Sequence, residues 1–320
     1  MTESKLYEPV ILSEELVLKL CQKYGINCVS WQLLKGGLIN TSVKVSSATN
    51  SYLLRIYPVE RTLPEIEFEM STLLRLNELH LPVQNPLLAL DGEIVSREED
   101  HYFVFLDFID GTVIEQPYDK IAVQIGTLIA QLHTGLKDFT PKGEKQPADI
   151  EFIDSEMSRL KESIPGQSDI YDSWIMLRDA QGSPELEKGV VHADIHPGNV
   201  VVSEDGDLKG VIDFDDCYYG SILFDLSIAA MSFSFESACK PNWNRAAKVV
   251  HAYEDERSKV DYRLLYWSMI VNCFRFYVYT VPLTLQDGFE AKENPYFKRA
   301  HFLMDRHIFD AYSKRLERDS

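Results

Sequence analysis

Residues 189–216, with the sequence GVVHADIHPGNVVVSEDGDLKGVIDFDD, gather two histidines, an asparagine and several carboxylates around two short apolar runs. The β-branched run at 200–202 and the apolar run at 208–212 are typical of strands, and the tetrapeptide EDGD between them is a turn signal. The segment therefore predicts a β-hairpin whose two ends lie close together.

This hairpin is expected to bring three oxygen-bearing side chains near one point. Asn199 lies just before the first strand, Asp213 just after the second, and Asp194 on the loop that leads in. Such oxygen ligands suit Mg²⁺, which usually needs only one or two carboxylates in addition to substrate phosphates. Asn199 and Asp213 are therefore the predicted metal ligands. Asp194 would accept the proton of an attacking hydroxyl, and His192 would orient the loop.

Two other interpretations of these residues remain open. His192, Asp194 and His196 alternate, so on an extended segment they would share one face and could bind a transition metal in a hydrolase. That interpretation leaves Asn199 and the DFDD tetrapeptide unexplained, and the Pro-Gly pair at 197–198 favours a loop. The second alternative is that the histidine, asparagine and aspartates are ordinary turn-forming residues.

The spacing H-x-D-x-x-x-x-N, followed by an aspartate after a hairpin, resembles the catalytic loop and metal-binding aspartate of the protein-kinase-like fold. In detail, HADIHPGN and VIDFDD resemble the aminoglycoside phosphotransferase and choline kinase family rather than protein kinases proper. The resemblance implies that ATP and Mg²⁺ are the cofactors. It also implies that Asp194 is the catalytic base, that Asn199 and Asp213 bind Mg²⁺, and that His192 is a structural member of the loop.

The resemblance extends past the DFDD tetrapeptide. Asp215 could reach a second metal or merely flank the first. Asp225 is the only charge in SILFDLSIAAMSF, and similar family members carry there an aspartate that braces the catalytic loop. Within the family, GVIDFDDCYYGSILFDLS is most similar to the homoserine kinase and hydroxylysine kinase branches.

The first part of the chain predicts a helix over 14–24, with an N-cap serine before it, and then strands near 29–36, 41–47 and 51–57. The connection between the first two strands offers glycine amides and then hydroxyls, where a phosphate chain could rest. Such a glycine pair is also a common turn. Its position ahead of the catalytic stretch favours the nucleotide loop of the family. The candidate nucleotide-binding residues here are Gly36, Gly37, Asn40, Thr41 and Ser42.

In the third strand, a period of two puts Leu53, Arg55 and Tyr57 on one face. Kinase-like folds carry at this place a lysine that holds the α- and β-phosphates and pairs with a helix glutamate. Arginine departs from that pattern, although its planar guanidinium can still contact phosphate and carboxylate. Lys44, on the preceding strand, is a second candidate phosphate contact. The alternative for both cations is a solvated charge at a strand edge.

The sequence PEIEFEMSTLLRLNEL, beginning at residue 64, predicts an amphipathic helix because apolar residues recur at helical spacing. Glu69 falls within the apolar stripe of this helix. A carboxylate aimed at the interior needs a partner, and we expect Arg55 to be that partner, as in the strand-lysine to helix-glutamate pair of the family.

The run HYFVFLDFIDG, at 101–111, resembles the fifth strand and interlobe hinge of the family. An adenine ring could form hydrogen bonds with backbone groups there, and by position these belong to Asp107 and Ile109. The alternative is an edge strand followed by a turn.

The composition limits the class of protein. A net charge of −18 argues against nucleic acid as a partner and is compatible with a cationic small substrate. The polar run MTESKLYEPV does not have the pattern of a secretory signal, so secretion is not expected, and five scattered cysteines fit a reducing cytoplasm. The most apolar window, 266–285, contains an asparagine, an arginine and a proline, so it predicts a buried helix rather than a membrane span.

Strands followed by helices predict an α+β, two-lobed fold. The resemblance implies that this is the protein-kinase-like fold, with residues 1–106 as the N-lobe and 107–320 as a helical C-lobe. Helices are expected near 241–255, 261–280 and 293–317. The predicted function is transfer of the γ-phosphate of ATP to a hydroxyl of a small, amine-bearing metabolite. Alternatives are an antibiotic phosphotransferase, a nucleotide-binding pseudokinase suggested by Arg55, and the metallohydrolase described above.

Overall fold

The computed structural model describes residues 10–34, 39–164, 167–181 and 185–317, which form two compact units. Unit 1 contains the described residues up to Gly111, together with Thr140–Lys145 and Lys209–Asp215. Unit 2 contains Thr112–Phe139, the described residues from Gln146 to Leu208, and those from Asp216 onward. The lobe boundary between residues 106 and 107 stays a prediction.

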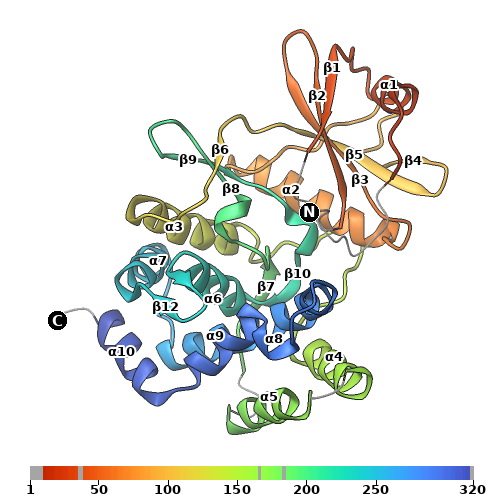
Figure 1. Ribbon diagram of the computed structural model, residues 1–320. Coiled ribbons are helices and arrows are strands. Elements are labelled where there is room, and N and C mark those ends of the chain that lie inside the picture. Colours follow the sequence, from red (N-terminus) through yellow and green to blue (C-terminus); the bar gives the residue numbers. More distant parts are fainter. Residues whose placement is uncertain (1–9, 35–38, 165–166, 182–184, 318–320) are drawn as a thin grey trace. The chain divides into compact units, whose positions relative to one another are not determined.

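Unit 1 is built on a five-stranded antiparallel sheet with the order β1-β2-β3-β5-β4 (Figure 1). The strands expected near 41–47 and 51–57 are present and end within a residue or so of the predicted bounds. The bounds are β1 Ser30–Leu33, β2 Thr41–Ser46, β3 Ser51–Ile56, β4 Ser96–Glu98 and β5 His101–Asp107.

The two faces of this sheet have different partners. Alternate residues of β2, β3 and β5, among them Val43, Leu54 and Phe105, pack with helix α1 (Glu14–Lys23) in one apolar core. The opposite face carries Arg55, which meets helix α2 (Leu63–Glu78). The period-two prediction for β3 is therefore confirmed, because neighbouring residues of the strand serve two different layers.

Both helices of unit 1 begin at capped ends. The Ser13 side chain accepts the N–H of Leu16 at the start of α1, as its N-cap position predicts. Thr62 and Glu65 form a capping box at the start of α2, with a proline in the first turn. The capping box fixes the turn that carries Arg61, which precedes α2.

Short strands surround the predicted catalytic segment. The hairpin is present: Ser203 donates its N–H to the Asp207 carbonyl, and Gly206 adopts a positive φ in the turn. Three small sheets have the orders β6-β8-β9, β10-β7 and β11-β12. The bounds are β6 Thr112–Val113, β7 Lys188–Val191, β8 Val200–Val202, β9 Leu208–Val211, β10 Tyr218–Ser221, β11 Phe235–Ser237 and β12 Lys240–Pro241.

The rest of unit 2 is helical (Figure 1). The helices expected near 241–255 and 261–280 are α7 and α8, and the stretch expected at 293–317 is divided between α9 and α10. The bounds are α3 Asp119–Gly135, α4 Ile150–Ser163, α5 Ser168–Gln181, α6 Ile222–Ser232, α7 Trp243–Glu256, α8 Tyr262–Gln286, α9 Pro295–Leu303 and α10 Arg306–Leu316, with 3-10 turns at Pro197–Asn199, Phe214–Asp216 and Ala291–Glu293.

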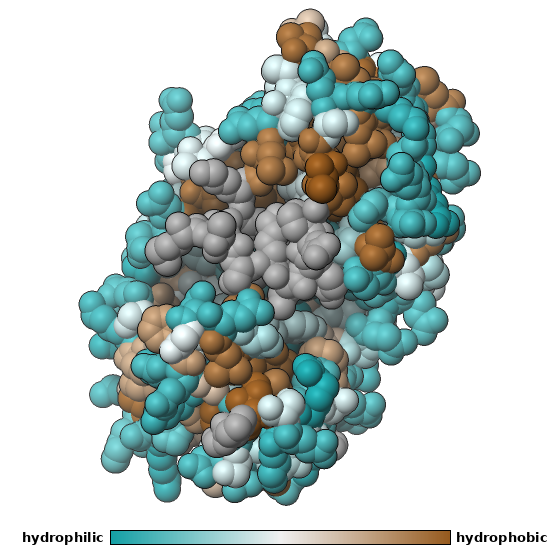
Figure 2. Space-filling model, turned by 45° about the vertical axis from the view of Figure 1, so that its right-hand side comes forward, coloured by the Kyte–Doolittle hydropathy of each residue, from teal (hydrophilic) through white to brown (hydrophobic). Residues whose placement is uncertain are grey.

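Helix α8 is the buried helix that the apolar window predicted. Most of its length is inaccessible to solvent, and its Asn272 donates to the Ser227 hydroxyl at 2.9 Å inside the unit. Within the described part of the chain, no helix combines the length and apolarity needed to cross a bilayer. Figure 2 shows hydrophobic residues on one face in several separate patches with hydrophilic residues around them.

Candidate active site

One buried carboxylate holds the backbone of the loop between β7 and β8. Asp225 of α6 is 0% exposed and accepts the N–H groups of His192 at 2.9 Å and Ala193 at 2.8 Å. The ring of His133, from α3, contacts the same carboxylate at 3.1 Å. Asp225 thus braces the loop, as the sequence predicted, and His133 is a core histidine rather than a metal ligand.

The loop presents Asp194 and Asn199 to each other. The Asn199 amide nitrogen donates to the Asp194 carbonyl at 3.0 Å and to the Asp194 carboxylate at 3.1 Å. The amide oxygen of Asn199 is thereby directed away from Asp194 and is the donor atom available to a cation. The Asp194 N–H donates to Nδ1 of His192 at 3.2 Å. The histidine therefore holds the backbone of Asp194, the predicted base.

Next to the base lies a second histidine. Nδ1 of His196 accepts the Gly198 N–H at 3.0 Å, and its Nε2 lies 3.5 Å from the Asp194 carboxylate. Because Nδ1 accepts, the ring proton belongs on Nε2, which faces Asp194. His196 is therefore engaged in the local structure of the loop. Among the described residues, no group of three or more histidine, cysteine and acidic side chains is placed to bind a metal together.

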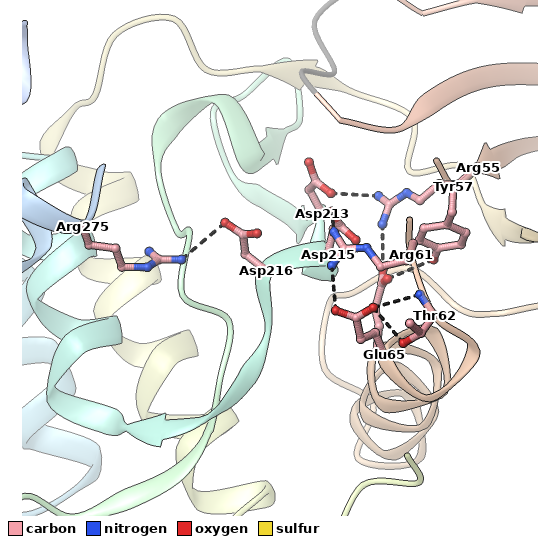
Figure 3. Close-up of polar contacts among 10 residues, drawn as sticks. Arg55, Tyr57, Arg61, Thr62, Glu65, Asp213, Asp215, Asp216 and Arg275 are labelled. Carbon is pink, nitrogen blue, oxygen red and sulfur yellow. Dashed lines mark hydrogen bonds and ion pairs between the residues drawn. The ribbon is translucent and has the colours of Figure 1, made fainter. Parts of the chain in front are cut away.

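In unit 1, Arg55 lies at the centre of a buried ionic cluster (Figure 3). Its guanidinium donates to Glu69 at 2.6 Å, as the sequence predicted, and lies 3.1 Å from Asp213. The Tyr57 hydroxyl donates to the second oxygen of Glu69 at 2.9 Å. Burial alone would lower the pKa of Arg55, but the charges of Glu69 and Asp213 outweigh it and raise that pKa, so the guanidinium stays charged.

The two aspartates of the DFDD tetrapeptide in unit 1 have different surroundings. The Asp213 side chain is 46% exposed, and its backbone has a φ of +66°. Asp215 is buried and paired with Arg61 at 2.7 Å (Figure 3). Burial raises the pKa of Asp215, but the positive charges of Lys145, Arg61 and Arg55 outweigh it, so the pKa is lowered. The geometry favours Asp213 as the accessible carboxylate and gives Asp215 an arginine partner.

The predicted phosphate loop is described only in part. Gly36 and Gly37 lie outside the described residues. Ser42 pairs with Arg55 across β2 and β3, so its side chain lies on the same face as the guanidinium. Thr41 is buried on the opposite face, and Asn40 is a buried residue next to Asp215. Of the hydroxyls, Ser42 is the one directed toward the Arg55 side of the sheet.

At the predicted hinge, the backbone of Asp107 is already engaged. Its N–H donates to the Asn85 carbonyl at 2.9 Å, and its carbonyl accepts from the Gln84 side chain at 3.1 Å. Ile109 forms no backbone hydrogen bond with any other described residue. A polar cavity of about 740 Å³ lies beside this segment, lined by Ser47, Ala48, Thr49, Asn50, Ser51, Tyr52, Leu87, Asp107, Phe108 and Asp110.

Lys44, the second candidate phosphate contact, interacts with an aromatic ring and a carboxylate of its own unit. Its ammonium lies 4.0 Å from the centre of the Phe108 ring and 3.4 Å from Asp110. Sequence reasoning also missed Arg61 and Arg275, which bind Asp215 and the catalytic loop. Arg275 could have been noticed because it is the one charged residue in the apolar window 266–285, and a buried charge needs a partner.

The family model of the phosphotransferase enzyme family, APH, matches residues 30–261 of this sequence. The chain belongs to this family. Membership of this family makes the protein a kinase, which confirms the prediction that it is a phosphate-transferring enzyme.

Similar proteins agree with this assignment. The homoserine kinase of Parvibaculum lavamentivorans is 24% identical over 233 residues, which cover 72% of this chain and 72% of that relative. Amicoumacin kinase hAmiN, solved with AMP-PNP, Ca²⁺ and Ami, has a TM-score of 0.70 at 18% identity, covering 94% of each chain. A microcompartment-associated aminopropanol kinase has a TM-score of 0.68 at 18% identity, covering 96% of this chain and 99% of that one. The predicted protein-kinase-like fold is confirmed.

The Tyr57 hydroxyl offers a test of the buried cluster of this phosphotransferase. Tyr57→Phe removes one donor from the Glu69 carboxylate and leaves the ring in place. We expect the free energy of unfolding, measured by urea titration, to fall by about 1.5–3 kcal/mol, as for other hydrogen bonds to charged groups. Tyr52→Phe is the matched control, because among the described residues the Tyr52 hydroxyl has one hydrogen-bond partner, the Asn50 side chain, from which it accepts at 3.3 Å. This variant should change the free energy of unfolding by less than about 0.5 kcal/mol. Equal effects of the two variants would contradict the role of Tyr57.

The Asp225 carboxylate gives a pH-dependent contribution to stability. Burial raises its pKa, but the hydrogen bond and charge interaction of His133 and the contacts of His192 outweigh it, so the pKa is lowered. A lowered folded-state pKa means that the contribution is present above the unfolded pKa of about 3.9 and disappears as pH falls through the folded value. We expect the stability difference between wild type and Asp225→Asn to be large at neutral pH and to shrink below about pH 4. Urea titrations across this range check it, and a difference that does not change with pH would refute it.

Proposed function

We propose that this chain transfers the γ-phosphate of ATP to a hydroxyl of a small, amine-bearing metabolite of the homoserine or hydroxylysine type. The observation that carries the proposal is the pairing of Asp194 with Asn199 on a loop held by the buried Asp225. The homoserine kinase relatives and the aminopropanol kinase likeness support an acceptor that carries both a hydroxyl and an amine.

In this proposal Asp194 accepts the proton of the acceptor hydroxyl. Its carboxylate accepts from the Asn199 amide, which orients one oxygen and leaves the carboxylate partly exposed. His192 holds the backbone N–H of Asp194, and Asp225 holds the two residues before it. These contacts fix the base before the substrate arrives, which is how positioning contributes to rate.

The donor set fits Mg²⁺. The amide oxygen of Asn199 and the half-exposed carboxylate of Asp213 are hard oxygen donors, and Mg²⁺ takes its other ligands from waters and nucleotide phosphates. Asn199 belongs to unit 2 and Asp213 to unit 1, so their meeting at one cation is part of the proposal. Bound there, Mg²⁺ would neutralise charge on the transferring phosphate. Asp215 already forms an ion pair with Arg61, so Asp213 is the better ligand for the cation.

The nucleotide would lie along the Arg55 face of the sheet. Arg55, oriented by Glu69, supplies a permanent positive charge for the phosphates, and Ser42 adds a hydroxyl on the same side. Ile109, whose backbone groups are not used by other described residues, is the better partner for adenine, since those of Asp107 are engaged. Gly36 and Gly37 would supply amides to the phosphates. We place the reaction in the cytoplasm, where the five free cysteines would stay reduced.

An ADP-release screen tests the proposal. The purified protein is given ATP and Mg²⁺ with L-homoserine, 5-hydroxylysine, 1-amino-2-propanol, choline or kanamycin, each against a reaction without acceptor. We expect acceptor-dependent ADP release with one of the amino alcohols or hydroxy amino acids. Turnover only with kanamycin would replace the acceptor class with antibiotics. Nucleotide binding without turnover on any compound would indicate a pseudokinase, and hydrolysis that needs no ATP a metallohydrolase.

A further inference from the structure

Arg275 of α8 is a buried cation beside the catalytic loop. The residue is 1% exposed, and its guanidinium donates to the Ala193 carbonyl at 2.6 Å. The same guanidinium lies 3.4 Å from Asp216 (Figure 3). The rings of Phe276 and Tyr279 lie 5.1 and 5.7 Å from its central carbon. A charge that is so deeply buried is costly unless it is paired, and the polar partners of this one include the residue directly before the predicted base.

The contact falls on a strained point of the loop. Ala193 has a φ of +67°, a conformation that a residue with a side chain adopts at a cost of about 1–3 kcal/mol. Such a conformation persists only when surrounding contacts hold it. The Ala193 N–H is held by Asp225, and its carbonyl is held by Arg275. Both backbone groups of this residue are therefore fixed by buried charged side chains.

The Ala193 carbonyl and the Asp194 N–H belong to one planar peptide unit. Arg275 holds the oxygen of this unit at 2.6 Å, and Nδ1 of His192 accepts its N–H at 3.2 Å. Two points of the plane are thereby fixed, and the side chain of Asp194 departs from the next carbon atom. Rotation of this plane would swing the carboxylate away from Asn199.

We propose that Arg275 is a positioning residue that sets the direction of the Asp194 carboxylate by clamping the peptide unit before it. The proposal rests on the function proposed above, in which Asp194 is the base. Arg275 would act through Asp194, because its buried guanidinium holds the peptide unit that precedes this residue. Its second contact, Asp216, is three residues after Asp213, so the same guanidinium also holds the last residue of the DFDD tetrapeptide.

The kinetic test compares three variants with wild type, using ATP, Mg²⁺ and the acceptor that gives the highest ADP release in the screen. Arg275→Met removes the clamp, and we expect kcat to fall by about 100-fold with the KM for ATP changed by less than about twofold, because misplacing a catalytic group affects the chemical step. Arg275→Lys keeps a charged donor and should recover kcat to within about tenfold of wild type.

Arg245→Met is the matched control. Arg245 also lies between a backbone carbonyl, that of Phe233 at 3.4 Å, and a carboxylate, that of Asp119 at 3.5 Å. In the described part of the chain, it has no hydrogen bond or ion pair with the predicted catalytic loop. Its loss should lower stability and leave kcat within about twofold of wild type. Equal losses of kcat in Arg275→Met and Arg245→Met would overturn the proposal, since the effect would then be structural. So would a kcat of Arg275→Met close to that of wild type.

A second readout does not depend on turnover. In protein labelled with ¹³C at alanine methyl groups, the Ala193 signal is identified by its absence from Ala193→Gly. We expect this signal to shift or broaden in Arg275→Met and to stay in place in Arg245→Met. An unchanged Ala193 signal would overturn the clamp. If wild type turns over no acceptor in the screen, the proposed function fails, and this measurement alone decides whether Arg275 sets the loop.

Discussion

Asp194→Asn is expected to bind ATP and lose about 1,000-fold in turnover, the size typical of a missing general base. The substitution keeps the shape of the side chain, but it removes the negative charge and the ability to accept a proton. The loop should stay in place, because the contacts that hold it run from Asp225 and Arg275 to the backbone of His192 and Ala193. ADP release with the best acceptor measures turnover, and fluorescence titration with an ATP analogue measures binding.

Asp205→Asn is the control for that experiment. Asp205 is an exposed residue in the hairpin turn, and its side chain forms no hydrogen bond or ion pair with the described residues. The same change of chemistry there should leave turnover unaltered. If Asp194→Asn were as active as Asp205→Asn, the proton would be accepted elsewhere, and the assignment of the base would be wrong.

Arg55→Met is expected to lower the free energy of unfolding by about 3–5 kcal/mol, the usual result of removing one partner from a buried ion pair. Glu69 is 1% exposed, and among the described residues it would keep the Tyr57 hydroxyl alone as a hydrogen-bond partner. Asp213 would lose its cation as well, but at 46% exposure it can be hydrated. Urea titration in the absence of nucleotide measures the loss.

The cause of that loss can be separated from the loss of packing. Adding Glu69→Leu to Arg55→Met removes the unpaired carboxylate, and we expect the double variant to recover most of the stability, because an apolar pair can replace a buried ionic one. Lys44→Met, on the neighbouring strand, removes a partly exposed cation and should cost less than about 1 kcal/mol. A double variant less stable than Arg55→Met alone would show that the carboxylate is not what destabilises it.

Several features followed from the sequence because they depend on local spacing. The alternation in β3 put Arg55 on the face opposite the α1 core, and the helical spacing in α2 turned Glu69 inward. Both side chains point into the space between β3 and α2, where an unpaired charge would be costly, so the two were expected to form an ion pair. The hairpin also followed, since two short apolar runs around a polar turn can form a hairpin without help from the rest of the chain.

Other features depended on partners that local spacing does not specify. Arg275 is 82 residues from Ala193, and Arg61 is 154 residues from Asp215. The sequence shows that a buried charge needs a partner, but packing decides which partner comes within reach. For the same reason the sequence named both Thr41 and Ser42 for the phosphates, and only the register with β3 separated them.

The sequence by itself determined the family, the two-layer pattern of the sheet and the position of the predicted catalytic loop, because each lies in a short run of residues. The tertiary structure decided how that loop is held. Its strained backbone at Ala193 is held between Asp225 and Arg275, on two helices that follow it in the chain. A backbone conformation that costs energy locally has to be stabilised by distant contacts, and those exist only in the folded molecule.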